Sequence, residues 1–366
     1  MNEPTRLHRI LELARWAPSG DNTQPWRFEI LGPDHIAVHG SDTRDWCLYD
    51  FRGHASHMAH GALLETLRIA ATGSGLSASW SPRDGTQDHA PVYDVKLAPD
   101  STEADPLLPH IEARTVQRRP MRGPRLTAAQ REVLVAAVGD AYTLQIFDTG
   151  ADKRRIARLL WDNAYIRLTC PEAYPVHRDI IEWGAQFSED RIPERAVGVD
   201  PMTGRLMRWV LGDWRRVDFF NRYLGGTIAP RVQLDVVPAL ACSAHVLLRP
   251  RHAPDGWLDH VAAGVAMQRL WLTAQSVGLH LQPEMTPVIF RWYARAGDVF
   301  TADAPLSARA EALATRFEAI ANAAPGDPFA FFCRLGVSAR PASRSTRLPL
   351  SALLIDPQDR PGDEPR

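Results

Sequence analysis

The chain has 366 residues, which is enough for one large domain or for two domains of ordinary size. Its 42 lysines and arginines nearly balance 43 aspartates and glutamates, so no overall charge field favours nucleic acid or a membrane surface as a partner. Apolar residues make up 45% of the chain without a membrane-spanning run, and the four cysteines form no zinc-binding CxxC pair. The N-terminal residues lack the apolar region of a signal peptide, so we expect a cytoplasmic protein.

The first predicted element is a helix over residues 6–15. Its apolar residues recur at helical spacing: Leu7, Ile10, Leu11 and Ala14. Pro18 cannot continue this helix, because proline lacks an N–H and disfavours the helical conformation of the preceding residue. Residues 26–31 alternate bulky apolar with polar side chains and predict a strand. The polar loop between them ends in Gln-Pro-Trp, which raises the question of what this loop holds.

Five further strands are predicted along the chain, over residues 35–39, 92–97, 142–147, 241–248 and 331–337. Long helical patterns separate them, so the fold class is α+β. We interpret residues 79–90 as a loop. Residues 174–223 are rich in tryptophan and arginine, too apolar for a linker and too charged for a core, and we treat them as an insert.

An internal repeat is present, because residues 61–80 and 264–283 align without gaps. Five positions are identical: Gly61/Gly264, Leu67/Leu270, Ala71/Ala274, Gly75/Gly278 and Leu76/Leu279. Both segments are apolar nearly all round, as expected of a buried helix. A strand lies near each, after the first (VYDVKLAP) and before the second (ACSAHVLLRP).

We interpret this repeat as two related lobes in one chain. The predicted boundaries are residues 1–108 for the N-terminal lobe, 109–350 for the C-terminal lobe with its insert, and 351–366 for a disordered tail.

The loop after the first helix, "APSGDNTQPWRF", resembles the Pro-Ser-x-x-Asn-x-Gln-Pro-Trp signature of the FMN-dependent nitroreductase-like family. The resemblance implies the family's fold, here two pseudo-symmetric lobes, each an antiparallel-rich sheet packed by helices. In that family the loop hydrogen-bonds a flavin that lies in the interface of a homodimer. It therefore implies that Ser19, Gly20, Asn22 and Gln24 bind the pyrimidine edge of the flavin, with bracing of the loop as the alternative for Gln24.

The family's other flavin-binding parts have counterparts in the second half of the chain. "ARTVQRRPMRG" resembles its arginine-rich segment, although Thr115 replaces the usual serine and the spacing to Arg118 differs by one. "LQPEMTP" has the position of its ring-side loop, and "RLGVSARPASRSTRLPL" resembles its basic ending. The whole is similar to the fused, two-lobed relatives of the Acg and MoeY type. This gene-fused pseudo-dimer implies one FMN per chain and is compatible with a monomer.

The resemblance also implies a role for each of these segments. Four arginines are candidates for the phosphate, with a solvated basic surface as the alternative for each: Arg114, Arg118, Arg344 and Arg347. The ring-side loop contributes Pro283, Glu284 and Met285, the last two through the backbone N–H that the family directs at flavin N5. Which arginine lies on the ring stays open.

Other motifs are weaker. His54, His57 and His60 lie three residues apart without a carboxylate to complete a ligand set, so we expect no metal. "GSGLSA" follows a helix rather than a strand, which argues against a dinucleotide fingerprint. The tryptophans of residues 161–214 are typical of packing rather than of a nucleic-acid platform.

The sequence thus predicts an FMN-dependent oxidoreductase that passes electrons from NAD(P)H to a small organic acceptor, with no nucleic-acid or membrane partner. The insert is expected to form a lid over the flavin. No catalytic side chain is assigned, and His177 is the only candidate proton donor. Two alternatives remain: an FMN-binding or storage protein with little turnover, and a flavin-dependent oxidase or dehydrogenase of a biosynthetic intermediate.

Overall fold

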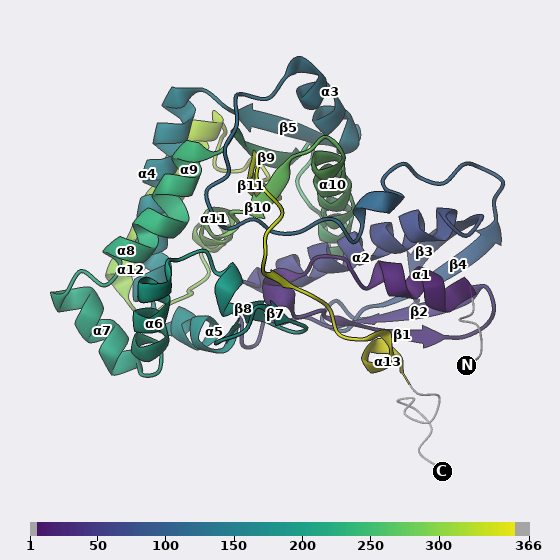
Figure 1. Ribbon diagram of the computed structural model, residues 1–366, viewed down its shortest axis with the longest axis horizontal. Helices are drawn as coiled ribbons and strands as arrows, with labels where there is room; N and C mark the ends of the chain where they lie inside the picture. Colours follow the sequence, from purple (N-terminus) through teal and green to yellow (C-terminus); the bar gives the residue numbers. More distant parts are fainter. Residues whose placement is uncertain (1–5, 356–366) are drawn as a thin grey trace, which may run out of the picture.

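The computed structural model describes residues 6–355 and contains two four-stranded antiparallel sheets, each packed by helices (Figure 1). The first sheet has the order β1-β2-β4-β3, with β1 at Trp26–Ile30, β2 at His35–Gly40, β3 at Leu76–Pro82 and β4 at Val92–Pro99. The second has the order β10-β11-β9-β5, with β5 at Tyr142–Phe147, β9 at Ala244–Pro250, β10 at His280–Pro283 and β11 at Phe331–Gly336. The predicted α+β class is therefore confirmed.

The two sheets share one strand order. Numbered along the chain within each half, the strands of both sheets lie in the order first, second, fourth, third. In each half a long helix, α2 (His54–Thr72) or α10 (Trp257–Ser276), connects the second strand to the third. By topology the strand VYDVKLAP corresponds to β11, whereas ACSAHVLLRP corresponds to β2. The two strands noted beside the repeat, β4 and β9, therefore occupy different positions in their sheets and are not counterparts of each other.

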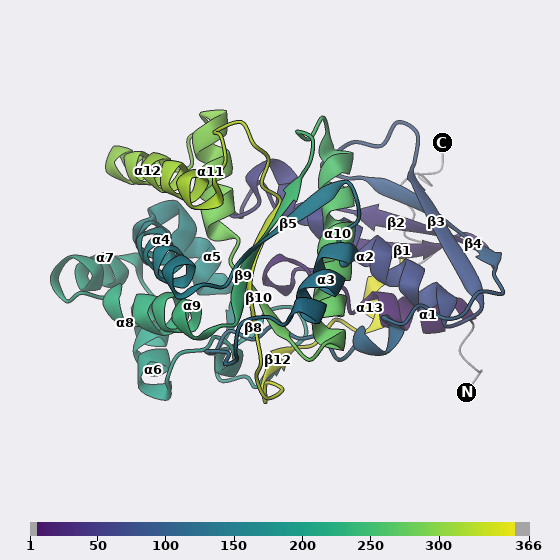
Figure 2. The same ribbon diagram turned by 90° about the horizontal axis from the view of Figure 1, so that it is seen from above.

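Helices α2 and α10 cross at Gly61 and Gly264, which are matched positions of the repeat. A Cβ atom on Gly61 would lie 1.9 Å from the carbonyl oxygen of Val261, and one on Gly264 would lie 2.0 Å from that of Met58. Only glycine allows two backbones to approach so closely. Figure 2 shows the two helices side by side between the sheets. Their apolar surfaces are buried because each helix packs against its own sheet and against the other helix.

Helices α1 (Arg6–Ala14) and α3 (Ala128–Ala137) pack beside α2 and α10 and share their apolar clusters. Helices α4 (Gly150–Thr169), α11 (Thr286–Ala296) and α12 (Ala304–Ala321) form a separate apolar cluster with residues of the second sheet. All four residues predicted for the apolar face of the first helix are buried. Residues 79–82, predicted to begin a loop, belong to β3 instead. None of the helices in residues 6–355 is long and apolar enough to cross a membrane.

The insert forms a layer of short elements between α4 and β9. Its elements are α5 (Tyr174–Asp179), β6 (Ile181–Glu182), β7 (Phe187–Ser188), β8 (Ile192–Pro193), α6 (Pro201–Val210), α7 (Trp214–Tyr223), α8 (Ile228–Pro230), a π-helix (Arg231–Val236) and α9 (Val237–Ala241). Four side chains make a small core of its own: Ile181, Ile192, Val197 and Val199. In Figure 1, α6, α7 and α8 lie at the end of the molecule farthest from the first sheet.

The C-terminal segment returns from the second sheet to the first. Its strand β12 (Arg344–Ser345) pairs in parallel with β7 of the insert. Helix α13 (Leu350–Leu353) then places Leu350 and Leu353 in the core of the first half, and Leu354 forms a bridge with Phe28 of β1. The prediction of a disordered tail is therefore wrong for residues 351–355, and residues 356–366 lie outside the described residues.

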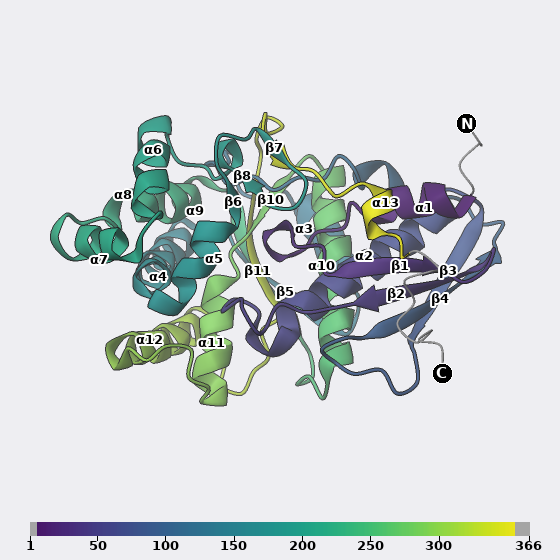
Figure 3. The same cartoon turned by 90° about the horizontal axis from the view of Figure 1, so that it is seen from below.

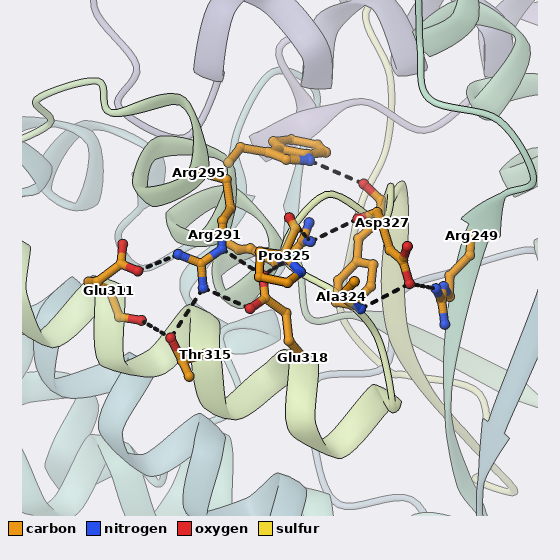
Figure 4. A network of polar contacts seen from close by, with 11 residues as sticks. Arg249, Arg291, Arg295, Glu311, Thr315, Glu318, Ala324, Pro325 and Asp327 are labelled. Atoms are coloured by element: carbon orange, nitrogen blue, oxygen red, sulfur yellow. Dashed lines mark hydrogen bonds and ion pairs between the residues drawn. The ribbon is translucent and has the colours of Figure 1, made fainter.

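A buried ion network joins α11 to α12 (Figure 4). The Glu318 carboxylate accepts hydrogen bonds from Arg291 Nε at 2.8 Å and from Arg295 Nε at 2.7 Å. Arg291 Nη2 also donates to the carbonyl oxygens of Pro325 and Asp327, at 2.9 and 2.8 Å. Arg291 and Glu318 are only 3% and 4% exposed. The network therefore fixes the turn that leads from α12 to β11.

Candidate functional site

A cavity of about 490 Å³ lies where α2, α10, the insert and the returning C-terminal segment meet. Cofactor-binding cavities typically measure roughly 300–1,000 Å³. Most of the predicted cofactor residues line it: Ser19, Gly20, Asn22, Arg114, Arg118, Pro283, Glu284, Met285, Arg344 and Arg347. Gln24 does not. The structure thus brings together segments that are more than 300 residues apart in the sequence.

The loop after α1 reaches this cavity from the first half, and Figure 3 shows it in purple at the centre of the molecule. Three of its non-glycine residues have positive φ: Asp21 (49°), Asn22 (67°) and Gln24 (48°). Such conformations cost on the order of 1–3 kcal/mol each and persist only where the surroundings fix them. One such restraint is Ser19 Oγ, which accepts a hydrogen bond from the backbone N of Gln24 at 3.0 Å.

The insert and the C-terminal segment supply the other restraints. Gln24 Nε2 donates to the carbonyl oxygen of Glu189 at 2.8 Å, and its Oε1 accepts from Leu348 N at 3.0 Å. Asn22 Nδ2 donates to the same Glu189 oxygen at 2.9 Å, and its Oδ1 accepts from Arg347 Nη1 at 2.8 Å. Of the two roles considered for Gln24, its position fits bracing of the loop rather than contact with a cofactor.

Three arginines surround Trp16 at one end of the cavity. Arg114 Nη2 donates to Trp16 O at 2.7 Å, and Arg347 Nε donates to Ala17 O at 2.9 Å. The Arg344 guanidinium lies 4.6 Å from the centre of the Trp16 ring. Within the described part of the chain, none of these three arginines forms an ion pair with a carboxylate. Within residues 6–355 their positive charge is therefore not neutralised by a paired carboxylate, although the more distant Glu112 acts on Arg344.

The pKa values reflect this crowding of cations. Burial, with a contribution from Arg344, lowers the pKa of Arg114 to about 9. Burial and the neighbouring Arg114, Arg344 and Arg15 lower the pKa of Arg347 well below its usual value. Arg114 is 4% exposed, and its Nε has no hydrogen-bond partner within residues 6–355. A bound anion would relieve this repulsion and supply an acceptor, which fits the phosphate of FMN.

Four charged residues of the cavity were not predicted: Asp21, Arg167, Asp235 and Arg334. Burial raises the pKa of the Asp21 carboxyl, and the Arg118 guanidinium opposes this rise. Burial lowers the pKa of Arg118 to about 10 despite the opposing charge of Asp21. Arg334 is 3% exposed in the middle of β11, and its Nε has no partner among the described residues. An arginine within the apolar strand "FFCRLG" is the signal that could have identified Arg334.

The ring-side loop is fixed by its neighbours. Glu284 accepts a hydrogen bond from Arg334 Nη1 at 2.9 Å, and its other oxygen lies 2.7 Å from His245 Nδ1. The Glu284 N–H donates to Phe332 O at 2.8 Å, so the expectation that this amide faces flavin N5 does not fit. The Met285 N–H, by contrast, has no acceptor within residues 6–355. Of the two predicted amides, only Met285 remains available to a ligand.

His177 lies on α5 of the insert and lines the cavity. Its Nε2 is 2.7 Å from the hydroxyl of Tyr49, a cavity residue that sequence reasoning missed. Burial and the Arg167 cation lower the pKa of His177 to about 3. His177 is therefore neutral near pH 7 and forms a neutral pair with Tyr49.

The histidines of α2 take structural positions. His60 Nε2 donates to Pro25 O at 2.8 Å, and its Nδ1 lies 3.1 Å from the Tyr93 hydroxyl. The histidine thus joins the Gln-Pro-Trp segment to the centre of the first half. Within residues 6–355, no group of three or more His, Cys, Asp or Glu side chains is arranged to hold a metal ion.

Comparison with solved structures finds similarity to FMN-binding, nitroreductase-like proteins at low sequence identity. A nitroreductase-like family protein from Bacillus cereus is 9% identical, with a TM-score of 0.35 over 70% of this chain and 97% of that one. The FMN-dependent nitroreductase NfnB from Mycobacterium smegmatis, in complex with NADPH, is 14% identical, with a TM-score of 0.36 over 68% and 96%. A nitroreductase with bound FMN from Desulfitobacterium hafniense is 12% identical, with a TM-score of 0.36 over 69% and 98%. No protein-family model and no curated protein sequence matches the chain.

Proposed function

We propose that this protein is an FMN-dependent oxidoreductase that takes electrons from NAD(P)H, delivers them to a small organic acceptor and binds one FMN in the cavity between its two halves. The observation that carries this proposal is the uncompensated arginine cluster, which lies in one cavity with the Pro-Ser-x-x-Asn loop. FMN supplies the two-electron chemistry, and the protein supplies binding, orientation and electrostatics.

Arg114, Arg344 and Arg347 hold the phosphate. Guanidinium groups suit this task because their paired donors match phosphate oxygens. The Met285 N–H and the Ser19–Asn22 loop flank the ring, while Arg334, paired with Glu284, and Arg118, opposite Asp21, lie on the same wall. A unit charge about 4 Å from the ring stabilises its anionic reduced form by roughly 4 kcal/mol at an effective dielectric constant of 20.

We further propose that the two halves derive from a duplicated lobe, fused into one chain. The shared strand order and the reciprocal glycines Gly61 and Gly264 support this origin. Only the first half carries a Pro-Ser-x-x-Asn loop, and only the second carries the arginines and the ring-side loop. A single chain therefore makes one complete site.

A second candidate, an FMN-binding protein with little turnover, is favoured by one observation. The backbone oxygen of Glu189 in the insert accepts hydrogen bonds from both Asn22 and Gln24, which fastens the insert to the loop. A fastened insert restricts exchange of large acceptors with solvent. The two candidates differ in their response to NAD(P)H.

Titration of the apoprotein with FMN is expected to give one site per chain. Arg344→Ala should weaken binding about 5- to 150-fold, because a hydrogen bond to a charged group contributes roughly 1–3 kcal/mol. Arg344 is the cleanest site for this test, since within residues 6–355 its guanidinium makes one hydrogen bond, to the carbonyl of Glu112, besides its contact with the Trp16 ring. Fluorescence quenching of FMN measures the affinity.

Arg83→Ala is the matched control for this titration. Arg83 is paired with Asp94 in the first sheet and does not line the cavity, so FMN affinity should stay unchanged. Two equivalent FMN sites per chain, or unchanged affinity after Arg344→Ala, would contradict the composite site.

Anaerobic addition of NADPH or NADH to the FMN-loaded protein is expected to bleach the yellow flavin absorbance, and an added quinone should restore it. The reason is that the cationic wall favours the reduced flavin. Stopped-flow absorbance measures both steps. A flavin-loaded protein that responds to neither nucleotide would rule out the reductase and leave the storage function.

A further inference from the structure

The two ends of the cavity differ in chemistry. The end beside Trp16 carries the uncompensated arginines, whereas the other end is enclosed by the insert. There the insert contributes mainly aliphatic side chains, among them Ile181, Val197, Met207, Val210, Leu211 and Val217. Together they line what we call the insert chamber, although Ile181 and Val197 also pack on each other in the insert's own core, with Met207 and Leu211 against them.

The insert chamber is balanced in charge. The charged side chains that border it occur in pairs of opposite sign: Arg167 with Asp235, whose Nη2 and Oδ2 lie 3.1 Å apart, Arg334 with Glu284, and Arg118 with Asp21. An ionised ligand would therefore lose its hydration without gaining a free countercharge. The two ends of the cavity therefore suit different ligands: an anion at the arginine end and an uncharged molecule in the insert chamber.

A polar pair faces this apolar volume, beside the Asn221 amide, which already donates to the carbonyl oxygen of Leu168. The Tyr49 hydroxyl lies 2.7 Å from His177 Nε2, and both residues line the cavity. They come from different parts of the chain, the segment before α2 and the insert. With His177 in its Nε2–H tautomer, the imidazole donates to the Tyr49 oxygen, which leaves the Tyr49 proton to donate to one ligand oxygen. Burial near Arg167 keeps His177 neutral, so the pair adds no charge.

We propose that the insert chamber binds the second substrate, an uncharged and largely aliphatic molecule whose single carbonyl or hydroxyl oxygen is held by Tyr49 and His177. This inference rests on the proposed function for the identity of the neighbouring cofactor. It assigns the insert a binding role beyond that of a cover. Aliphatic walls fit a flexible chain, and the single hydrogen-bonding pair fixes which end of the chain enters first.

The test uses isothermal titration of the FMN-saturated protein with 2-nonanone, 1-nonanol and nonanoate, at a pH where nonanoate is ionised. The ketone and the alcohol are expected to bind, and nonanoate at least about tenfold more weakly because its charge must be desolvated. Tyr49→Phe should weaken binding of 2-nonanone about 3- to 10-fold, the effect of one hydrogen bond. Tyr142→Phe is the matched control, since Tyr142 lies on β5 and does not line the cavity.

A second variant tests the volume itself. Val210→Trp should fill the insert chamber and weaken both neutral probes tenfold or more, while FMN affinity stays unchanged. Thermal melting checks that each variant is folded. Failure of both neutral probes to bind a protein that does bind FMN, preference for nonanoate, or equal effects of Tyr49→Phe and Tyr142→Phe would each overturn the inference. Binding of the neutral probes without FMN binding would support the insert chamber and reject the proposed cofactor.

Discussion

Replacing Gly264 with alanine is expected to lower the free energy of unfolding by about 3 kcal/mol or more, at or above the upper end of typical overpacking effects. The added Cβ atom would lie 2.0 Å from the backbone oxygen of Met58. Neither atom belongs to a flexible side chain, so α2 and α10 must move apart. Because these helices contribute to the cores of both halves, the separation loosens packing on both sides. Urea denaturation followed by circular dichroism measures the loss.

The reciprocal variant Gly61→Ala should behave alike, since its Cβ would lie 1.9 Å from Val261 O. Gly326→Ala is the control, because a Cβ at that position meets no atom within 4 Å. A loss below about 1 kcal/mol for Gly264→Ala would show that the helices separate easily, contrary to the close crossing. FMN affinity should fall as well, because Met58 and Met267 on the facing helices line the cavity.

Glu318→Ala is expected to destabilise the protein by about 3–5 kcal/mol, the usual effect of removing one partner from a buried ion pair. The variant leaves the Arg291 guanidinium buried without its carboxylate, and it also removes the bonds from Arg295 (Figure 4). Chemical denaturation measures this loss. FMN affinity should stay unchanged, because Glu318 does not line the cavity.

Glu311→Ala provides the comparison within the same network. Its carboxylate also pairs with Arg295, but its side chain is 53% exposed, so the expected loss is about 1 kcal/mol or less. Similar losses in the free energy of unfolding for the two glutamate variants would mean that burial of the Arg291–Glu318 pair does not determine how much the pair contributes to stability.

The elements with regular apolar patterns were predictable from the sequence, whereas β3 and β10, which lack such a pattern, were not. The bounds of α1 were predicted to within one residue because its apolar residues recur at helical spacing. The bounds of β5 were predicted because apolar and polar residues alternate in its sequence. Strand β3 lies at the edge of its sheet and reads "LSASWSP", where serines and a proline replace the alternating apolar residues. Strand β10 has only four residues, too few for a periodic signal.

The cavity could be predicted only where residues follow one another in a motif. The loop from Pro18 to Trp26 was identified because its neighbours in sequence are also neighbours in space. Tyr49 carries no such local pattern and comes to the cavity from the segment before α2, where it meets His177 of the insert. Arg334 is marked only as a charge within an apolar strand, which does not say that it faces a cavity. The Glu284 N–H is unavailable to a ligand because it donates to Phe332 O. This hydrogen bond depends on how β10 and β11 pair, which a sequence motif does not specify.

The return of the C-terminal segment to the first sheet has a consequence for synthesis on the ribosome. Helix α13 completes the core of the first half, yet it is made long after that half has emerged. At roughly 5–20 residues per second, the interval between residues 108 and 354 is about 12–50 s. During this time the first half lacks Leu350 and Leu353, and its loop lacks Arg347. Under the proposed function, the phosphate site is therefore complete only when translation is nearly finished, and a chain interrupted before this segment is expected not to retain FMN.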